Sequence, residues 1–294
     1  MASPFVTLQY VLPHHLISRV VLVATRVRFA PVKNWLIRAF MRGFQPDLSD
    51  AVETDPLAYP TFNAFFTRPL KSSTRPLAGD ETVVVSPVDG TVSQCGEIHA
   101  EQILQAKRHH YSLTALLAGA AAGWSDRFRN GAFATIYLAP YNYHRIHMPT
   151  TGTLQEAWYV PGRLFSVNQA TAVEVPNLFA RNERIVLLFT GECGPFAVIF
   201  IGALNVGSMA TVWHGDVTPR WSRRVTALPM PSPDARRLSR GAEVGRFNMG
   251  STVILLFGPD AVTLTAGVKA GVTVRLGQSL GQVTSRPKPL NNPQ

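Results

Sequence analysis

A serine that directly follows a glycine can attack its own backbone, and Gly250-Ser251 is the most informative such pair in this 294-residue chain. Glycine has no Cβ to shield its carbonyl carbon, and it reaches backbone angles that other residues avoid. The Ser251 hydroxyl could convert the preceding peptide bond into an ester. Elimination and hydrolysis would then leave a pyruvoyl group on a new N-terminus, a ketone able to do chemistry that other enzymes take from a separate cofactor. Gly-Ser-Thr is also common in turns, so the other residues must decide.

Self-cleavage of this kind needs a base for the serine proton and a group that orients the base. Asp89 follows Ser-Pro-Val and precedes a glycine, which predicts a tight turn between two strands. His147 lies in a segment bounded by two prolines. Asp89, His147 and Ser251 could form a relay with the logic of a serine hydrolase, with the enzyme's own backbone as substrate. An aspartate before glycine can also be only a turn former, and a histidine in a loop can be a surface residue.

A second histidine, His144, lies three positions before His147. Histidine pairs at short spacing are common zinc ligands. No Cys, Asp or Glu lies close by to complete a metal site, and the other histidines match no metal motif. We therefore predict that no metal is bound.

Residues 245–257 read Gly-Arg-Phe-Asn-Met-Gly-Ser-Thr-Val-Ile-Leu-Leu-Phe. They resemble the processing site of one family, the bacterial phosphatidylserine decarboxylases, and further blocks of the chain resemble the same family. The other blocks are Ser-Pro-Val-Asp-Gly-Thr-Val (86–92), Tyr-His-Arg-Ile-His-Met-Pro (143–149), Leu-Phe-Ser-Val-Asn (164–168), Val-Pro-Asn-Leu-Phe-Ala-Arg-Asn-Glu-Arg (175–184), Thr-Phe-Asn-Ala-Phe-Phe-Thr-Arg-Pro-Leu (61–70) and Leu-Gln-Tyr-Val-Leu-Pro (8–13). The similarity runs in order through nearly the whole chain.

The resemblance implies a proenzyme that cuts itself between Gly250 and Ser251 into residues 1–250 (β chain) and 251–294 (α chain). It implies that Asp89, His147 and Ser251 carry out the cleavage, and that Ser251 becomes the pyruvoyl group that holds the substrate as a Schiff base. His144 would serve the decarboxylation, as proton donor or as part of the carboxylate site. Ser166 is expected to contact the substrate. The implied reaction converts phosphatidylserine to phosphatidylethanolamine and CO₂ without a metal or pyridoxal phosphate.

Two positions depart from the family pattern: Asn142 stands where Asp is expected, and Met249 replaces the commoner Leu before the scissile glycine. Neither removes a residue with an assigned role. An alternative function is a pyruvoyl-dependent decarboxylase of a soluble amino acid, since relatives of that kind exist. A serine hydrolase acting on an external ester would be expected to carry Gly-x-Ser-x-Gly before a helix. A binding module without activity would leave the three blocks around Asp89, His147 and Ser251 unexplained.

The net charge of +10 implies an acidic partner. Six Lys and Arg residues lie within residues 1–46 among bulky apolar ones, and the first acidic residue is Asp47. This pattern predicts a segment lying in a membrane interface rather than a spanning helix, since arginines interrupt the apolar run. An organellar transit peptide or a buried helical hairpin are alternatives. Cys95 and Cys193 have no metal-like or redox-like spacing, which fits a reducing compartment.

These observations predict the partners and the location of the protein. We expect a phospholipid substrate, an anionic membrane surface and contact between the two cleavage fragments, and no nucleic acid. The chain could also form a homodimer. The expected location is peripheral, on the cytoplasmic side of a bacterial inner membrane.

Hydrophobic periodicity predicts an α+β, mainly β fold, built as a β-sandwich or partly open barrel behind an N-terminal helical, membrane-facing segment. We expect residues 1–45 to be that amphipathic segment and residues 46–294 to be the β-rich catalytic domain. Helices are predicted over 14–44 and 113–122, a lipoyl-like closing hairpin over 268–280, and a mobile surface loop over 229–240. The predicted strands are 82–85, 90–94, 133–138, 153–160, 185–190, 196–202, 208–213, 253–257, 262–265 and 272–276.

Overall fold

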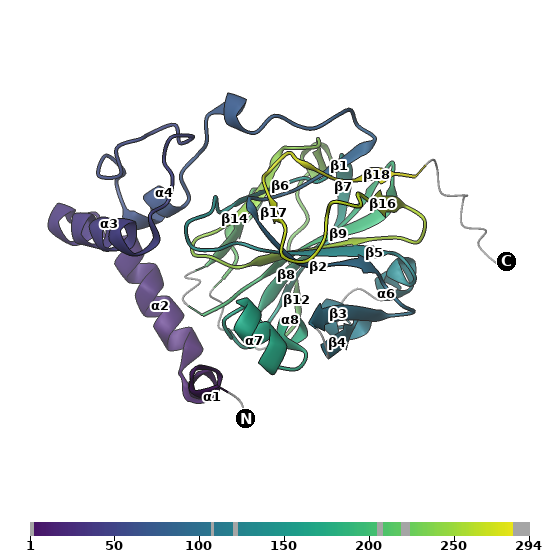
Figure 1. Ribbon diagram of the computed structural model, residues 1–294, viewed down its shortest axis with the longest axis horizontal. Helices are drawn as coiled ribbons and strands as arrows, with labels where there is room; N and C mark the ends of the chain where they lie inside the picture. Colours follow the sequence, from purple (N-terminus) through teal and green to yellow (C-terminus); the bar gives the residue numbers. More distant parts are fainter. Residues whose placement is uncertain (1–2, 107–108, 120–122, 205–207, 219–223, 285–294) are drawn as a thin grey trace.

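The computed structural model describes residues 3–106, 109–119, 123–204, 208–218 and 224–284. Its N-terminal part is helical, with α1 (Pro4–Val11), α2 (His14–Thr25) and α3 (Ala30–Phe44). These helices lie to one side of a β-rich body (Figure 1). The predicted single helix over 14–44 is divided between Thr25 and Ala30. Pro31 explains the division, because proline fits the first turn of a helix but not its interior. The short helix α1 lies within the helical segment predicted over 1–45 but outside the helix predicted over 14–44.

None of the described helices is by itself long and apolar enough to cross a membrane. Helices α1 and α2 together have the required length and composition, but they are bent by 88° relative to each other.

Helix α3 is anchored by an aromatic cluster and by one buried lysine. Ile37 and Phe40 pack against α4 (Phe62–Phe66) and Tyr59. Lys33, which is buried, donates from Nζ to the carbonyl oxygens of Leu57 and Tyr59 at 2.7 and 2.8 Å. The segment after α3 is therefore tied back to the helix through Lys33.

The body is built on a nine-stranded antiparallel sheet. The strands follow the order β12-β7-β8-β9-β15-β5-β2-β17, with β13 also paired to β7. Their bounds are β2 (Gly90–Glu97), β5 (Ala132–Tyr137), β7 (Gly152–Val160), β8 (Arg184–Gly191), β9 (Gly194–Ile201), β12 (Thr226–Ala227), β13 (Arg237–Leu238), β15 (Thr252–Phe257) and β17 (Thr273–Val274). Among the described strands the two ends of this sheet do not pair, so it does not close into a barrel.

Three smaller antiparallel sheets and several short helices complete the body. The sheets are β1-β18-β16, β11-β10-β14-β6 and β3-β4. Their strands are β1 (Val83–Val85), β3 (Gln102–Ala106), β4 (His109–Ser112), β6 (Arg145–His147), β10 (Met209–Thr211), β11 (Gly215–Asp216), β14 (Glu243–Phe247), β16 (Val262–Leu264) and β18 (Ser279–Val283). The helices are α5 (Leu113–Leu117), α6 (Trp124–Phe128), α7 (Gln169–Glu174) and α8 (Leu178–Arg181), with 3₁₀ turns at Ser72–Thr74 and Pro233–Arg236.

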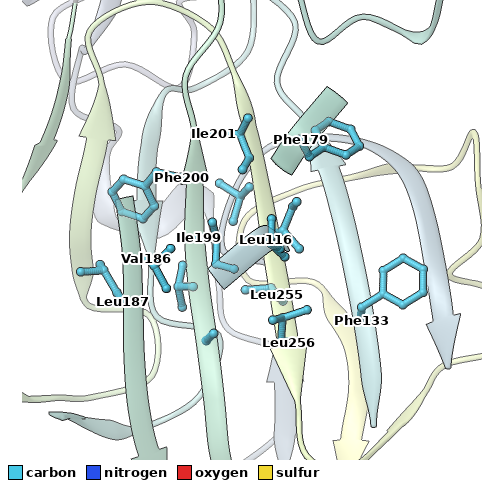
Figure 2. Packing of buried hydrophobic residues seen from close by; sticks show 14 of the residues in the cluster. Leu116, Phe133, Phe179, Val186, Leu187, Ile199, Phe200, Ile201, Leu255 and Leu256 are labelled. Carbon is cyan, nitrogen blue, oxygen red and sulfur yellow. The ribbon is translucent and has the colours of Figure 1, made fainter. Parts of the chain in front are cut away.

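The main hydrophobic core lies on this large sheet. Strand β15 is buried along all six of its residues and lies between β5 and β9. Because a strand in the middle of a sheet can be covered on both faces, its sequence is a continuous apolar run rather than an alternating one. Figure 2 shows buried residues of this cluster on three neighbouring strands, namely Val186 and Leu187 of β8, Ile199 to Ile201 of β9 and Leu255 and Leu256 of β15. Successive side chains on a strand point to opposite faces, so both faces of the sheet are covered by apolar residues. Because β15 is paired on both sides, it fixes the backbone position of Ser251, the residue directly before it.

The mainly β fold with an N-terminal helical segment is confirmed, whereas three local predictions are wrong. The segment 268–280 is not a hairpin, because β17 pairs with β2 in the large sheet while β18 pairs with β1 and β16. The loop predicted over 229–240 holds a 3₁₀ turn and β13, which pairs with β7. The helix predicted over 113–122 ends at Leu117, and Ala118 has φ of 57°; residues 120–122 of that prediction lie outside the described part.

Candidate active site

The predicted scissile bond lies where the chain passes from one sheet to another. Residues 248–251 join β14, in the four-stranded sheet, to β15 in the large sheet. Ser251 is completely buried, and its Oγ has no hydrogen-bond partner among the described residues. Its carbonyl oxygen accepts a hydrogen bond from the Leu138 amide at 2.8 Å. The backbone of Ser251 is therefore fixed by the sheet, while its hydroxyl makes no hydrogen bond to the described residues.

The space beside Gly250 suits glycine. A Cβ added there would lie 3.2 Å from Cε1 of His144 and 3.3 Å from the carbonyl oxygen of Leu138. Contacts this short would push the neighbours away from the scissile bond. Glycine therefore allows the His144 ring to approach the peptide unit directly.

His144 is the predicted site residue that lies against this bond. It is completely buried, and its ring stacks on Phe66 of α4 with 4.1 Å between ring centroids. Nε2 lies 3.2 Å from the carbonyl oxygen of Pro140, which can only accept, so Nε2 carries the proton. Nδ1 is then unprotonated, and it has no partner within the described part of the chain. Burial lowers the pKa of His144 to about 3, so the ring is neutral at physiological pH.

His147 lies on β6, in a segment that we had predicted as a loop. Its Nδ1 lies 2.7 Å from the carbonyl oxygen of Gly241, so Nδ1 carries the proton and Nε2 accepts the hydroxyl hydrogen of Tyr143 at 3.0 Å. Burial also lowers the pKa of His147. Both of its ring nitrogens are thus engaged, and neither is bonded to Asp89 or Ser251.

Asp89 occupies the turn between β1 and β2, as predicted. It accepts three hydrogen bonds from Arg75, at 2.6, 3.0 and 3.2 Å, and one from the Leu276 amide at 2.8 Å. Arg75 also donates to Asp50 at 2.6 Å. These carboxylates raise the pKa of Arg75. The predicted hydrogen-bonded relay from Asp89 through His147 to Ser251 is therefore not formed in this arrangement.

The cavities divide the predicted site residues into two groups. A cavity of about 270 Å³ is lined by Gly250 and Met249, by Ser166, and by the aromatic side chains of Phe40, Phe44 and Phe66. Ser166 thus lies in the cavity of the scissile bond, and its amide donates to Gln9 Oε1 of α1 at 2.7 Å.

Asp89 lines a second cavity of about 220 Å³, and His147 lines a third of about 190 Å³. Arg75 and Tyr143 line both of these. The sequence prediction missed Arg75, Tyr143 and Phe66 as neighbours of the site. Tyr143 and Phe66 lie within blocks that were singled out, but nothing in the spacing indicates which side chain each one meets. No group of three or more potential metal ligands occurs in the described part of the chain.

Comparisons with known proteins identify the family of the chain. The phosphatidylserine decarboxylase family model matches residues 62–282, and a second model, described as PSD, matches residues 4–45. A phosphatidylserine decarboxylase proenzyme of Shewanella denitrificans is 50% identical over 286 residues, covering 96% of this chain and 99% of that protein. Proenzymes of the same name from Alkalilimnicola ehrlichii (51% identical, 91% of this chain and 93% of that protein) and Azotobacter vinelandii (49%, 94% and 96%) are also similar. The chain therefore belongs to the phosphatidylserine decarboxylase family.

Proposed function

We propose that this protein cleaves itself between Gly250 and Ser251 and then decarboxylates phosphatidylserine to phosphatidylethanolamine and CO₂. The observation that carries the proposal is the buried Ser251 hydroxyl, which has no hydrogen-bond partner among the residues that the structure describes, next to a glycine against which the His144 ring lies. Leaving a buried hydroxyl unpaired costs about 1–3 kcal/mol. Self-cleavage would explain why the protein bears this cost, because the hydroxyl that attacks the peptide bond must remain free of other hydrogen bonds.

The self-cleavage reaction needs no reagent from outside the protein except water. Ser251 Oγ bonds to the Gly250 carbonyl carbon as its proton passes to a base, and the C–N bond breaks to give an ester. Loss of the Ser251 Cα proton then expels the Gly250 carboxylate and leaves dehydroalanine. Its tautomer is hydrolysed, which releases ammonia and leaves a pyruvoyl group at residue 251.

We assign the relay role to Asp89 and His147, as the family resemblance implies, and we expect a rearrangement before they reach Ser251. In the present arrangement Tyr143 and Arg75 hold these two side chains. Two observations support a role for His144 at the reacting carbon: its ring lies close to Gly250, and its unprotonated Nδ1 makes no hydrogen bond to any described residue. His144 can take part in proton transfer at Nδ1, or it can form part of the site that holds the substrate carboxylate.

The pyruvoyl group would accept the electron pair left on the substrate Cα when CO₂ departs. The cavity beside Gly250 is suited to a lipid bearing an amine. Phe40, Phe44 and Phe66 offer an apolar wall for acyl chains, and the Ser166 hydroxyl offers a polar contact for the headgroup. The apolar wall also excludes water, which favours departure of the carboxylate.

We further propose that the protein is peripheral on the cytoplasmic face of the inner membrane. The helical segment α1 to α3 exposes many large apolar side chains and also the cations Arg28, Arg38 and Arg42. The exposed apolar residues are Phe5, Leu8, Tyr10, Val11, Leu16, Val20, Val23, Phe29, Val32, Trp35 and Phe44. Such a face is suited to the interface of an anionic bilayer.

Intact mass measurement together with CO₂ release tests the proposal. The purified protein should consist of residues 1–250 and residues 251–294, the latter blocked to Edman degradation. It should release CO₂ from detergent-dispersed phosphatidylserine, and Ser251→Ala should remain one chain without activity. Release from free serine or tryptophan instead would favour the soluble amino acid as substrate, and an active protein that stays uncut would refute self-cleavage.

A further inference from the structure

We propose that Asn248 is a positioning residue for self-cleavage, and that Asp216 holds its side chain in place. This inference rests on the proposed self-cleavage at Gly250–Ser251. It concerns residues to which neither the sequence motifs nor the relay assigns a role.

The side chain of Asn248 is held from both ends. It is buried, with 2% of its surface exposed. Its Oδ1 accepts from Asn63 Nδ2 of α4 at 3.1 Å. Its Nδ2 donates to Asp216 Oδ1 at 3.0 Å and to Ser208 Oγ. Its backbone amide donates to the carbonyl oxygen of Ser208 at 2.9 Å. The amide group therefore uses both its acceptor and its donor, which fixes its orientation.

Asp216 is itself oriented by its other contacts. Its Oδ1 also accepts from Ser208 Oγ at 3.2 Å, and its Oδ2 forms an ion pair with Arg26, the residue that follows α2. The carboxylate thus links the helical segment to the four-stranded sheet. Hydrogen bonds to charged groups are stronger than those between neutral groups, so this is the firmest contact that Asn248 makes.

The consequence for the scissile bond follows from chain geometry. Asn248 fixes the chain on one side of Gly250, and the pairing of Thr252 with Tyr137 and Ile201 fixes it on the other. Only three residues, Met249 to Ser251, lie between these two anchors. The hydroxyl must come within about 3–3.5 Å of the carbonyl carbon in line for attack, and an error of about 1 Å can cost about a hundredfold in rate. Fixed ends on so short a segment restrict Gly250 and Ser251 to few conformations.

The test compares the cleavage rate with the activity of the product. Newly translated full-length chain is followed by gel and intact mass for wild type, Asn248→Ala and Asp216→Ala. We expect cleavage to slow by about tenfold or more for Asn248→Ala and by a smaller factor for Asp216→Ala, as expected of lost orientation. After cleavage, residue 248 belongs to a free chain end, so kcat and KM for phosphatidylserine, counted per pyruvoyl group, should stay within about twofold of wild type.

Gln105→Ala is the matched control. Gln105 is a completely buried amide with three hydrogen bonds, to the carbonyl oxygens of Ala172 and Val175 and from the Leu178 amide. Its loss should lower thermal stability as much as that of Asn248 while folded chains cleave at the wild-type rate. Equal cleavage rates for wild type and Asn248→Ala, or equal slowing in Gln105→Ala, would overturn the inference. Asp216 is partly exposed, so Asp216→Ala remains informative if Asn248→Ala does not fold. A wild-type chain that never cleaves would instead refute the proposed function.

Discussion

At the scale of single residues, the site is marked by two buried atoms that make no hydrogen bond to the described residues. Ser251 Oγ and His144 Nδ1 are both buried; Ser251 directly follows Gly250, and the His144 ring lies against Gly250. Native proteins pair most buried polar atoms, because each unpaired one costs about 1–3 kcal/mol. Two such atoms next to a glycine that admits no Cβ without displacement indicate a site kept for chemistry rather than for stability.

Gly250→Ala tests this close approach. The added methyl would press on the His144 ring and on the Leu138 carbonyl, and would displace the scissile carbonyl. We expect self-cleavage to slow by about tenfold to a hundredfold, since small misplacements of reacting atoms have effects of that size. The fraction of cleaved chain over time after translation measures it. Gly267→Ala is the control, because a Cβ there would meet nothing within 4 Å. Cleavage of Gly250→Ala at the wild-type rate would contradict the crowding argument.

The burial of His144 also predicts how stability depends on pH. Its pKa is lowered to about 3 in the folded protein, against about 6.5 in the unfolded chain. Between these values the unfolded chain binds a proton that the folded protein does not, so the contribution is present above pH 6.5 and is lost as the pH falls toward 3. In the uncleaved Ser251→Ala background, the free energy of unfolding should fall by about 1.4 kcal/mol per pH unit more than it does in the same chain carrying His144→Phe.

Denaturant unfolding at pH 6, 5 and 4 measures this difference. Glu183 acts in the opposite direction in both proteins, because burial raises its pKa to about 7 and its contribution is lost as the pH rises from about 4.5 to 7. The comparison between the two variants cancels it. Parallel slopes would show that His144 can be protonated in the folded protein.

At the scale of elements, the strongly periodic segments were predictable and the short ones were not. Strands β5, β7, β8, β9 and β15 match predicted strands within a residue or two, because each is a long β-branched or apolar run. Strands β3, β4, β6, β14 and β18 were missed, since their residues carry no clear alternation and their pairing is decided by distant partners. The division between α2 and α3 could have been found from Pro31.

The identities of the site residues could be predicted from sequence blocks, but their contacts could not. Asp89 was expected to meet His147, yet Arg75, 14 positions earlier, takes its carboxylate. The ring of His144, which lies against Gly250, is packed on Phe66 of α4. Both outcomes depend on packing between elements far apart in the chain. The local pattern of a single sequence does not show which distant elements will pack together.

The tie between Arg75 and Asp89 should be strongly stabilising. Each side chain is 11% exposed, and removing one partner of a nearly buried pair leaves a charge without compensation. In the Ser251→Ala background we expect Arg75→Met to lower the free energy of unfolding by about 3–5 kcal/mol. The matched variant Arg129→Met removes an exposed pair with Asp126 and should cost about 1 kcal/mol or less. Urea unfolding of both compares them, and similar small losses would show that Asp89 is well solvated without Arg75.

At the scale of the whole molecule, the helical segment and the site share a boundary. Phe40 and Phe44 of α3 line the cavity of Gly250, and Phe44 is also 46% exposed. Helices α1 to α3 lie to one side of the β-rich body (Figure 1), and they carry most of the exposed large apolar side chains named above. A lipid whose tails remain in a bilayer could therefore reach the cavity along α3 without leaving the membrane entirely.

This layout predicts that membrane binding depends on both apolar contact and charge. Phe29 and Trp35 are each 66% exposed, and burying a large side chain contributes about 1.5–3 kcal/mol. Phe29→Ser with Trp35→Ser should therefore weaken binding to vesicles of anionic phospholipid by at least about tenfold. Replacing Arg28, Arg38 and Arg42 by Gln should weaken it by about a hundredfold at low salt, at about 1 kcal/mol for each cation, and little at high salt.

Vesicle co-sedimentation at low and high salt, with anionic and with neutral vesicles, separates the two contributions. Val212→Ser is the matched control, because this side chain is 48% exposed but lies beside β10 rather than on the helices. The apolar variant should lose binding to both kinds of vesicle, whereas the Gln variant should lose binding only to the anionic ones. Both should still release CO₂ from detergent-dispersed phosphatidylserine, since neither set of residues lines the cavity of Gly250. Unchanged binding of both variants would place the membrane-facing surface elsewhere on the molecule.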